Sequence, residues 1–299
     1  MNAIEIRDLT KSFKGMYALN GFNMNVPIGS IYGFIGENGS GKSTTEKLIC
    51  GLLVADKGSI KLFGKDYTEP GVRIRVGALI ESVGCFPSSS VYMNLKMQAL
   101  NLNIDNIDEE IDRVLKIVRM EDSKKIKFKS CSLGMKQRIG IAMALLGDPE
   151  LLILDEPING LDTDGMRIMR EILTDLSKSG KTILISSHIL GELEKIATHY
   201  GVIRQGKLII ELSAKDMDSR SRNFISLKTK DMHNALDILK RKYLKVKEEE
   251  GYLKVYDVEN TEEIVEYLLI NNHVVNEIKK NKIGLEEYYI ELISKKEER

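Results

Sequence analysis

One short segment of the chain has the residue types and spacing needed to hold a phosphate chain. It follows the apolar run IYGFI and consists of Gly36, Glu37, Asn38, Gly39, Ser40, Gly41, Lys42, Ser43 and Thr44. Glycines allow such a loop to wrap around phosphate oxygens with its amide groups pointing inward. The spacing G-x-x-x-x-G-K-[ST] predicts Lys42 on the β- and γ-phosphates and Ser43 on Mg²⁺.

A second segment, LLILDEP, places two carboxylates directly after four apolar residues. A buried strand can bring Asp155 and Glu156 to the sheet edge beside the phosphate loop, where ligands of such sheets bind. There Asp155 is expected to hold Mg²⁺ through water, and Glu156 to orient and deprotonate the attacking water. On its own, this segment could equally be the solvated end of a strand. Together with the phosphate loop, it indicates a nucleoside triphosphatase.

A third segment, KSCSLGMKQRIG, has Ser132 and Gly134 at the expected start of an amphipathic helix. Free amide groups at a helix start, beside a hydroxyl and a glycine, suit an anion such as phosphate. The chain therefore has a second candidate phosphate site, some ninety residues beyond the first.

Composition limits the classes of protein to consider. The 299 residues, 42% apolar and 29% charged, suffice for one large and one small globular domain. The 44 Lys and Arg balance the 44 Asp and Glu, so no overall field favours a nucleic acid or an anionic bilayer. Three cysteines favour reduced thiols in the cytosol. No segment approaches the roughly 18 apolar residues that span a membrane.

Strand and helix patterns alternate up to about residue 212, which predicts an α/β core with a mainly parallel sheet. Strands are expected at 22–26, 30–36, 59–63, 75–80, 151–157, 182–188, 200–205 and 206–212. Helices are expected from residue 42, near 91–102 and 108–118, and over 135–146 and 164–176. The polar segment 213–223 then predicts a boundary between domains 1–215 and 216–299. The second domain reads β-α-β-β-α-β-α, a small α+β unit of the ferredoxin-like type.

The phosphate loop, SLGMKQR, LDEP, NGLD and the SSH at a strand end occur in an order that resembles the nucleotide-binding subunit of ABC transporters, over residues 1 to about 215. The resemblance implies a P-loop NTPase core with a helical signature subdomain, and ATP and Mg²⁺ as cofactors. It also implies that Ser132 and Gly134 contact the ATP held by a facing subunit. Two chains, identical or paralogous, would then enclose two nucleotides.

Three further residues take roles from the same resemblance. His188 matches the histidine that reaches the γ-phosphate, which makes it the expected catalytic companion of Glu156 and Lys42. Asp162, in NGLD, matches the loop where the two subunits touch. Phe13 stands where the family stacks an aromatic ring on adenine, although an aromatic residue near a strand end usually packs inward.

Two departures from the common family pattern point to a branch. The third segment matches the signature sequence of the family, L-S-G-G-Q. It has Cys131, Leu133 and Met135 in place of the Leu, the first Gly and the Gln. Glu81 stands where most relatives have Gln, and is expected as a further carboxylate near Mg²⁺; the alternative is a contact with a transmembrane subunit. Glu81, this form of the signature and the chain length resemble the bacitracin-resistance and lantibiotic-immunity branch.

The resemblance implies an ATP-hydrolysing subunit, cytoplasmic and peripheral on the inner face of the cell membrane. It would dock on separately encoded transmembrane permease subunits and power export of an antimicrobial peptide. No nucleic-acid partner is expected. One alternative is a soluble ABC ATPase acting on ribosomes or DNA, but such relatives tend to carry two nucleotide domains or a long coiled-coil insertion. Another is a non-hydrolysing scaffold, which Glu156 argues against.

Overall fold

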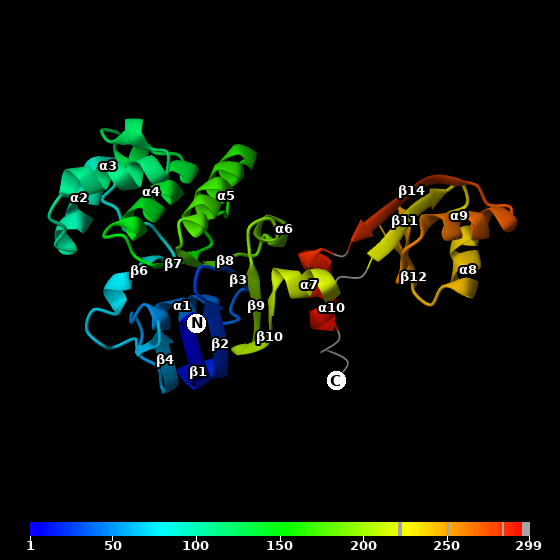
Figure 1. Ribbon diagram of the computed structural model, residues 1–299, viewed down its shortest axis with the longest axis horizontal. Helices are drawn as coiled ribbons and strands as arrows, with labels where there is room; N and C mark the ends of the chain where they lie inside the picture. Colours follow the sequence, from blue (N-terminus) through cyan, green and yellow to red (C-terminus); the bar gives the residue numbers. More distant parts are fainter. Residues whose placement is uncertain (221–222, 250, 283, 295–299) are drawn as a thin grey trace. The chain divides into compact units, whose positions relative to one another are not determined.

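The computed structural model describes residues 1–220, 223–249, 251–282 and 284–294 (Figure 1). The chain divides into two compact units, Met1–Ala214 and Lys215–Arg299. This division lies one residue from the boundary expected at 215/216.

A six-stranded sheet forms the centre of the first unit, in the order β10-β9-β3-β8-β7-β6. Its strands are β3 (Ile31–Ile35), β6 (Val76–Leu79), β7 (Leu151–Asp155), β8 (Thr182–Ser186), β9 (His199–Arg204) and β10 (Lys207–Ser213). All neighbouring pairs are parallel except β9 and β10. Strands β3 and β8 are buried along their whole length, which explains why their sequences are apolar without alternation. The predicted, mainly parallel α/β sheet is confirmed.

A second, antiparallel sheet of the first unit was not predicted. Its order is β2-β1-β4-β5. Its strands are β1 (Asn2–Phe13), β2 (Met16–Pro27), β4 (Lys57–Leu62) and β5 (Lys65–Asp66). Only parts of β2 and β4 were predicted, and β1 and β5 were missed. Irregular register between Ile6 and Leu9 interrupts the alternation of β1, so the two-residue period that reveals a strand is lost.

Helices of the first unit surround the parallel sheet or group beside it. They are α1 (Lys42–Ile49), α2 (Val91–Asn101), α3 (Ile107–Ile117), α4 (Leu133–Leu145), α5 (Thr163–Lys178) and the short α6 (Leu190–Leu193). Three 3₁₀ turns cover Arg73–Arg75, Glu121–Ser123 and Phe128–Ser130. Helices α2, α3 and α4 pack against one another (Figure 1), as expected of a helical signature subdomain. Helix α6 was not predicted.

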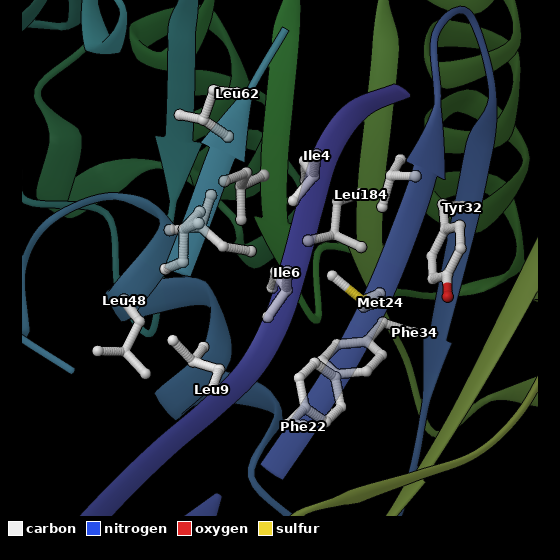
Figure 2. Close-up of a cluster of buried hydrophobic side chains, with 14 of the residues drawn as sticks. Ile4, Ile6, Leu9, Phe22, Met24, Tyr32, Phe34, Leu48, Leu62 and Leu184 are labelled. Carbon is white, nitrogen blue, oxygen red and sulfur yellow. The ribbon is translucent and has the colours of Figure 1, made fainter. Parts of the chain in front are cut away.

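The core of the first unit joins its two sheets (Figure 2). Phe22 of β2 packs edge-on against Phe34 of β3, with ring centroids 6.0 Å apart. Leu48 of α1 is fully buried in the same cluster. Burying a side chain of this size contributes about 1.5–3 kcal/mol. The helix that follows the phosphate loop is thereby held firmly against both sheets.

The second unit is a four-stranded antiparallel sheet, ordered β12-β13-β11-β14, with its own apolar core. Its elements are α7 (Ala214–Arg220), β11 (Asn223–Thr229), α8 (Met232–Lys242), β12 (Val246–Glu249), β13 (Tyr252–Tyr256), α9 (Thr261–Ile270), β14 (Val275–Lys282) and α10 (Leu285–Ser294). This order confirms the ferredoxin-like prediction. The expectation that residues 213–223 only interrupt the strand and helix pattern is wrong. They include helix α7, in which Met217 is buried.

No helix within the described parts of the chain is both long and apolar enough to cross a membrane.

Candidate active site

The phosphate loop connects β3 to α1, and its glycines are required by their surroundings. Gly39 and Gly41 have φ angles of 79° and 114°, which side chains disfavour. A Cβ on Gly36 would lie 2.6 Å from the carbonyl oxygen of Ile203, and one on Gly41 2.7 Å from that of Ala18. The loop can therefore bring its backbone against a ligand only with glycine at these positions.

Lys42 lies inside the curve of this loop and is buried. Its Nζ donates to the carbonyl oxygens of Gly36 and Glu37 at 2.6 and 3.1 Å. The buried hydroxyl of Ser40 has no hydrogen-bond partner among the described residues. A hollow of about 250 Å³ opens at the loop. It is lined by Ala18, Asn38, Gly39, Gly41, Lys42, Ser43, Thr44, Asp155 and Glu156.

Oxygen atoms suited to Mg²⁺ meet at one side of this hollow. Ser43 Oγ lies 3.4 Å from Asp155 Oδ2, while Asp155 Oδ1 accepts a hydrogen bond from Ser186 Oγ at 2.8 Å. Within the described ranges, no group of three or more His, Cys, Asp or Glu side chains could hold a metal by itself. Mg²⁺ commonly binds through one or two carboxylates together with substrate phosphates. The residues present fit that arrangement.

Glu156 follows directly on β7, with a left-handed φ of 50°. Its N–H donates to both the carbonyl oxygen and the Oγ of Ser186, at 3.2 and 3.1 Å. Its Oε2 lies 2.7 Å from Nδ1 of His188, after the end of β8. Neighbouring strands β7 and β8 thus bring the carboxylates of Asp155 and Glu156 and the imidazole of His188 together. This arrangement can position a water molecule and accept its proton.

A second hollow, of about 380 Å³, lies at the start of α4 and shares no lining residue with the first. Ser132 caps α4 by accepting from Met135 N–H at 3.2 Å, and Asp162 caps α5 by accepting from Gly165 N–H at 2.8 Å. Both residues line this hollow, as does Gly134. The structure therefore brings these three residues together, but in a hollow separate from the phosphate loop of the same chain.

Glu81 and Phe13 have placements that the motifs alone did not specify. The backbone N–H of Glu81 donates a hydrogen bond to Asp155 Oδ2 at 3.3 Å. The side-chain carboxylate of Glu81 instead accepts a hydrogen bond from Lys47 Nζ at 2.5 Å. The backbone of Glu81, and not its side chain, thus contacts the Asp155 carboxylate. Phe13 ends β1 with 44% of its surface exposed, and it does not line the phosphate hollow.

Sequence reasoning missed Glu46, which is fully buried on α1. Neither of its carboxyl oxygens has a hydrogen-bond partner among the described residues. Burial, and next the negative charge of Asp155, raise the pKa of Glu46 to about 8. The available signal was an acidic residue on the helix face that also carries the buried Thr45 and Ile49. Glu46 therefore keeps its proton near neutral pH.

We expect Glu46→Gln to stabilise the protein, increasingly as pH rises. The folded chain keeps this proton to about pH 8, whereas the unfolded chain releases it near pH 4.5. The proton contributes stability below pH 4.5, and that contribution is lost as pH rises toward 8. The neutral amide avoids this loss, so the gain is near zero at pH 4.5 and about 3 kcal/mol at pH 7.

Urea unfolding at pH 5, 6, 7 and 8, without metal or nucleotide, measures this effect. Glu37→Gln, at an exposed position of the phosphate loop, is the matched control. Parallel stability profiles for Glu46→Gln and the original chain would show that Glu46 is ionised in the folded protein.

The fold and this site define a P-loop nucleoside triphosphatase of the ABC type. The ABC transporter family model matches residues 19–159. The bacitracin transport ATP-binding protein BcrA of Bacillus licheniformis is 36% identical over 298 residues, 97% of each chain. The lantibiotic transport ATP-binding protein SrtF of Streptococcus pyogenes is 41% identical over 208 residues, 70% of this chain and 90% of SrtF.

Among solved structures, cbiO1 of Clostridium perfringens, part of the ABC transporter complex cbiONQ, is similar with a TM-score of 0.66. It is 30% identical, and the match covers 73% of this chain and 91% of cbiO1. The chain belongs to the ATP-binding proteins of ABC transporters, and it is an ATPase.

Proposed function

We propose that this ATPase powers a membrane exporter that removes an antimicrobial peptide of the bacitracin or lantibiotic kind. One observation supports ATP hydrolysis at this site: Lys42, Asp155 and Glu156 line a single hollow at the phosphate loop. The peptide substrate is supported by relatives whose names specify bacitracin and lantibiotic transport. The BcrA match extends over nearly the whole chain, so it includes the second unit.

In the proposed reaction, the phosphate loop and Lys42 bind the triphosphate, and Phe13 stacks on the adenine. Ser43 and Asp155 would hold Mg²⁺, which would neutralise charge on the phosphates. Ser186 fixes both the Asp155 carboxylate and the Glu156 backbone. Glu156 accepts a proton from the attacking water. His188, hydrogen-bonded to Glu156, keeps that carboxylate oriented toward the γ-phosphate.

The second hollow supports a dimer. Ser132, Gly134 and Asp162 lie apart from the phosphate loop of their own chain, so we place them on the nucleotide of a facing chain. Because one chain carries both halves, two copies would complete two sites. ATP would close the pair, and hydrolysis would allow it to reopen.

A third hollow, of about 480 Å³, offers a place for the permease. Its lining is mostly apolar and comes from the residues just after α1, the Arg73–Arg75 turn, β6 and the segment that follows it, α2 and α4. Leu52, Ile74 and Leu102 line it while remaining 65%, 76% and 41% exposed. We propose that a cytosolic segment of a separately encoded permease fills this hollow and so places the chain at the inner face of the membrane. The second unit, residues 215–299, would be an accessory domain.

Resistance of the native host to bacitracin-type and lantibiotic peptides tests this function. We expect deletion of the gene to lower the inhibitory concentration of one such peptide severalfold. Restoring the original chain should recover resistance, whereas Lys42→Ala should not, because Lys42 is needed to hold the triphosphate.

Purification of the tagged chain from detergent-solubilised membranes should recover a multispanning membrane protein. Unchanged sensitivity to every peptide of this class would argue against the proposed substrate. Recovery of the chain with ribosomes alone would favour the soluble alternative.

A further inference from the structure

Lys47 and Glu81 form an ion pair beside the metal site, with Nζ 2.5 Å from Oε1. Lys47 lies near the end of α1, and its side chain is 29% exposed. The Glu81 side chain is 63% exposed. Lys47 is thus the more covered partner, and Glu81 is the partner with more freedom to move.

The backbone of Glu81 is anchored although its side chain points elsewhere. Its φ of 62° is left-handed, a conformation that residues other than glycine seldom adopt. Its N–H donates to Asp155 Oδ2 at 3.3 Å. The backbone of Glu81 is therefore attached to the Asp155 carboxylate, while Lys47 holds the side-chain carboxylate of Glu81 away from it. A change of the Glu81 side-chain rotamer alone, with the backbone held, would release this carboxylate from Lys47.

Each member of the pair belongs to a segment that reaches both the phosphate site and the apolar hollow. Helix α1 starts at Lys42 and Ser43, and its other end leads to Cys50 and Leu52, which line the apolar hollow. The residues on either side of Glu81, Ile80 and Ser82, line the same hollow. The ion pair thus connects two segments that each extend from one site to the other.

We propose that Lys47 is a positioning residue that holds the Glu81 carboxylate away from Asp155, and so raises the Mg²⁺ concentration needed to bind nucleotide. This inference rests on the proposed function of the site. The Lys47 ammonium and Mg²⁺ are both cations that attract the same carboxylate, so binding to one opposes binding to the other. Exposed ion pairs are weak, which sets the expected change at about two- to fivefold.

Mg²⁺ titration of fluorescent ATP-analogue binding to the isolated full-length chain measures this competition without relying on hydrolysis. Lys47→Met should lower the half-saturating Mg²⁺ concentration about two- to fivefold. Glu81→Gln should raise it, because a carboxylate available to the metal is lost. The double variant should match Glu81→Gln, since Lys47 acts only through Glu81. Lys65→Met, at an exposed position of β5, is the control and should match the original chain.

Superimposable curves for Lys47→Met and the original chain would overturn the inference. The inference would also be overturned if Lys47→Met shifted the half-saturating Mg²⁺ concentration equally with and without Glu81→Gln. Lys47 would then act through its positive charge and not through Glu81. So would a Glu81→Gln curve identical to that of the original chain. Failure of the proposed function looks different: the original chain would then bind no nucleotide at any Mg²⁺ concentration. Thermal melting of each variant verifies that it is folded.

Discussion

Replacing Glu156 by Gln is expected to remove most ATP turnover while leaving ATP binding intact. Glu156 lies directly after Asp155, and its carboxylate is hydrogen-bonded to His188 at 2.7 Å. Gln keeps the shape and the hydrogen bond but cannot accept the proton of the attacking water. A positioned general base contributes about 10² to 10⁴ in rate, which corresponds to roughly 3 to 5 kcal/mol of barrier. Steady-state phosphate release and equilibrium ATP binding measure the two parts.

The matched control is Glu109→Gln, at an exposed position of α3. It should leave turnover unchanged. A Glu156→Gln protein that keeps more than half of the original turnover would remove Glu156 from the role of general base.

Ser132→Arg is expected to abolish turnover of the assembled protein without weakening ATP binding to an isolated chain. The hollow that Ser132 lines shares no residue with the phosphate hollow of its own chain. A long cationic side chain at the start of α4 would obstruct the nucleotide of the facing chain instead. Lys42→Ala should also abolish turnover, but it should weaken ATP binding to the isolated chain, because it removes the phosphate contact within that chain.

Mixing these two inactive variants separates the alternatives. In a mixed dimer, one interface contains both changes and the other contains neither, so activity should partly return. Ser130→Arg, two residues earlier and exposed, is the control for an added arginine and should remain active. Equal loss of ATP affinity in isolated Ser132→Arg and Lys42→Ala chains would mean that Ser132 serves the nucleotide of its own chain.

Local patterns predicted most of the fold. The continuous apolar runs of β3, β7 and β8 indicated strands covered on both faces, and the structure confirms them. Strand β1 could not be found in this way, because its irregular register with β2 breaks the alternation. Its pairing also depends on β4, some fifty residues away, which no local period reports. Helix α7 was missed because its polar composition resembles a linker.

The same distinction applies to the site. The phosphate loop and the Asp155–Glu156 pair were predictable because each is a short motif with its chemistry in consecutive residues. Ser186 was not, because its contacts exist only once β7 and β8 align Asp155 with it. The burial of Glu46 likewise depends on how α1 packs. Such residues acquire their roles from tertiary contacts, which the sequence alone does not display.

We propose that each ATP is held between the phosphate loop of one chain and the start of α4, with Ser132 and Gly134, of another. Light scattering after size-exclusion chromatography measures the mass of the Glu156→Gln protein in Mg²⁺ and ATP, and the nucleotide in the same fraction is quantified separately. We expect a particle of twice the 33.7 kDa chain mass that carries one ATP per chain and dissociates when ATP is removed. A 33.7 kDa monomer saturated with ATP would contradict it.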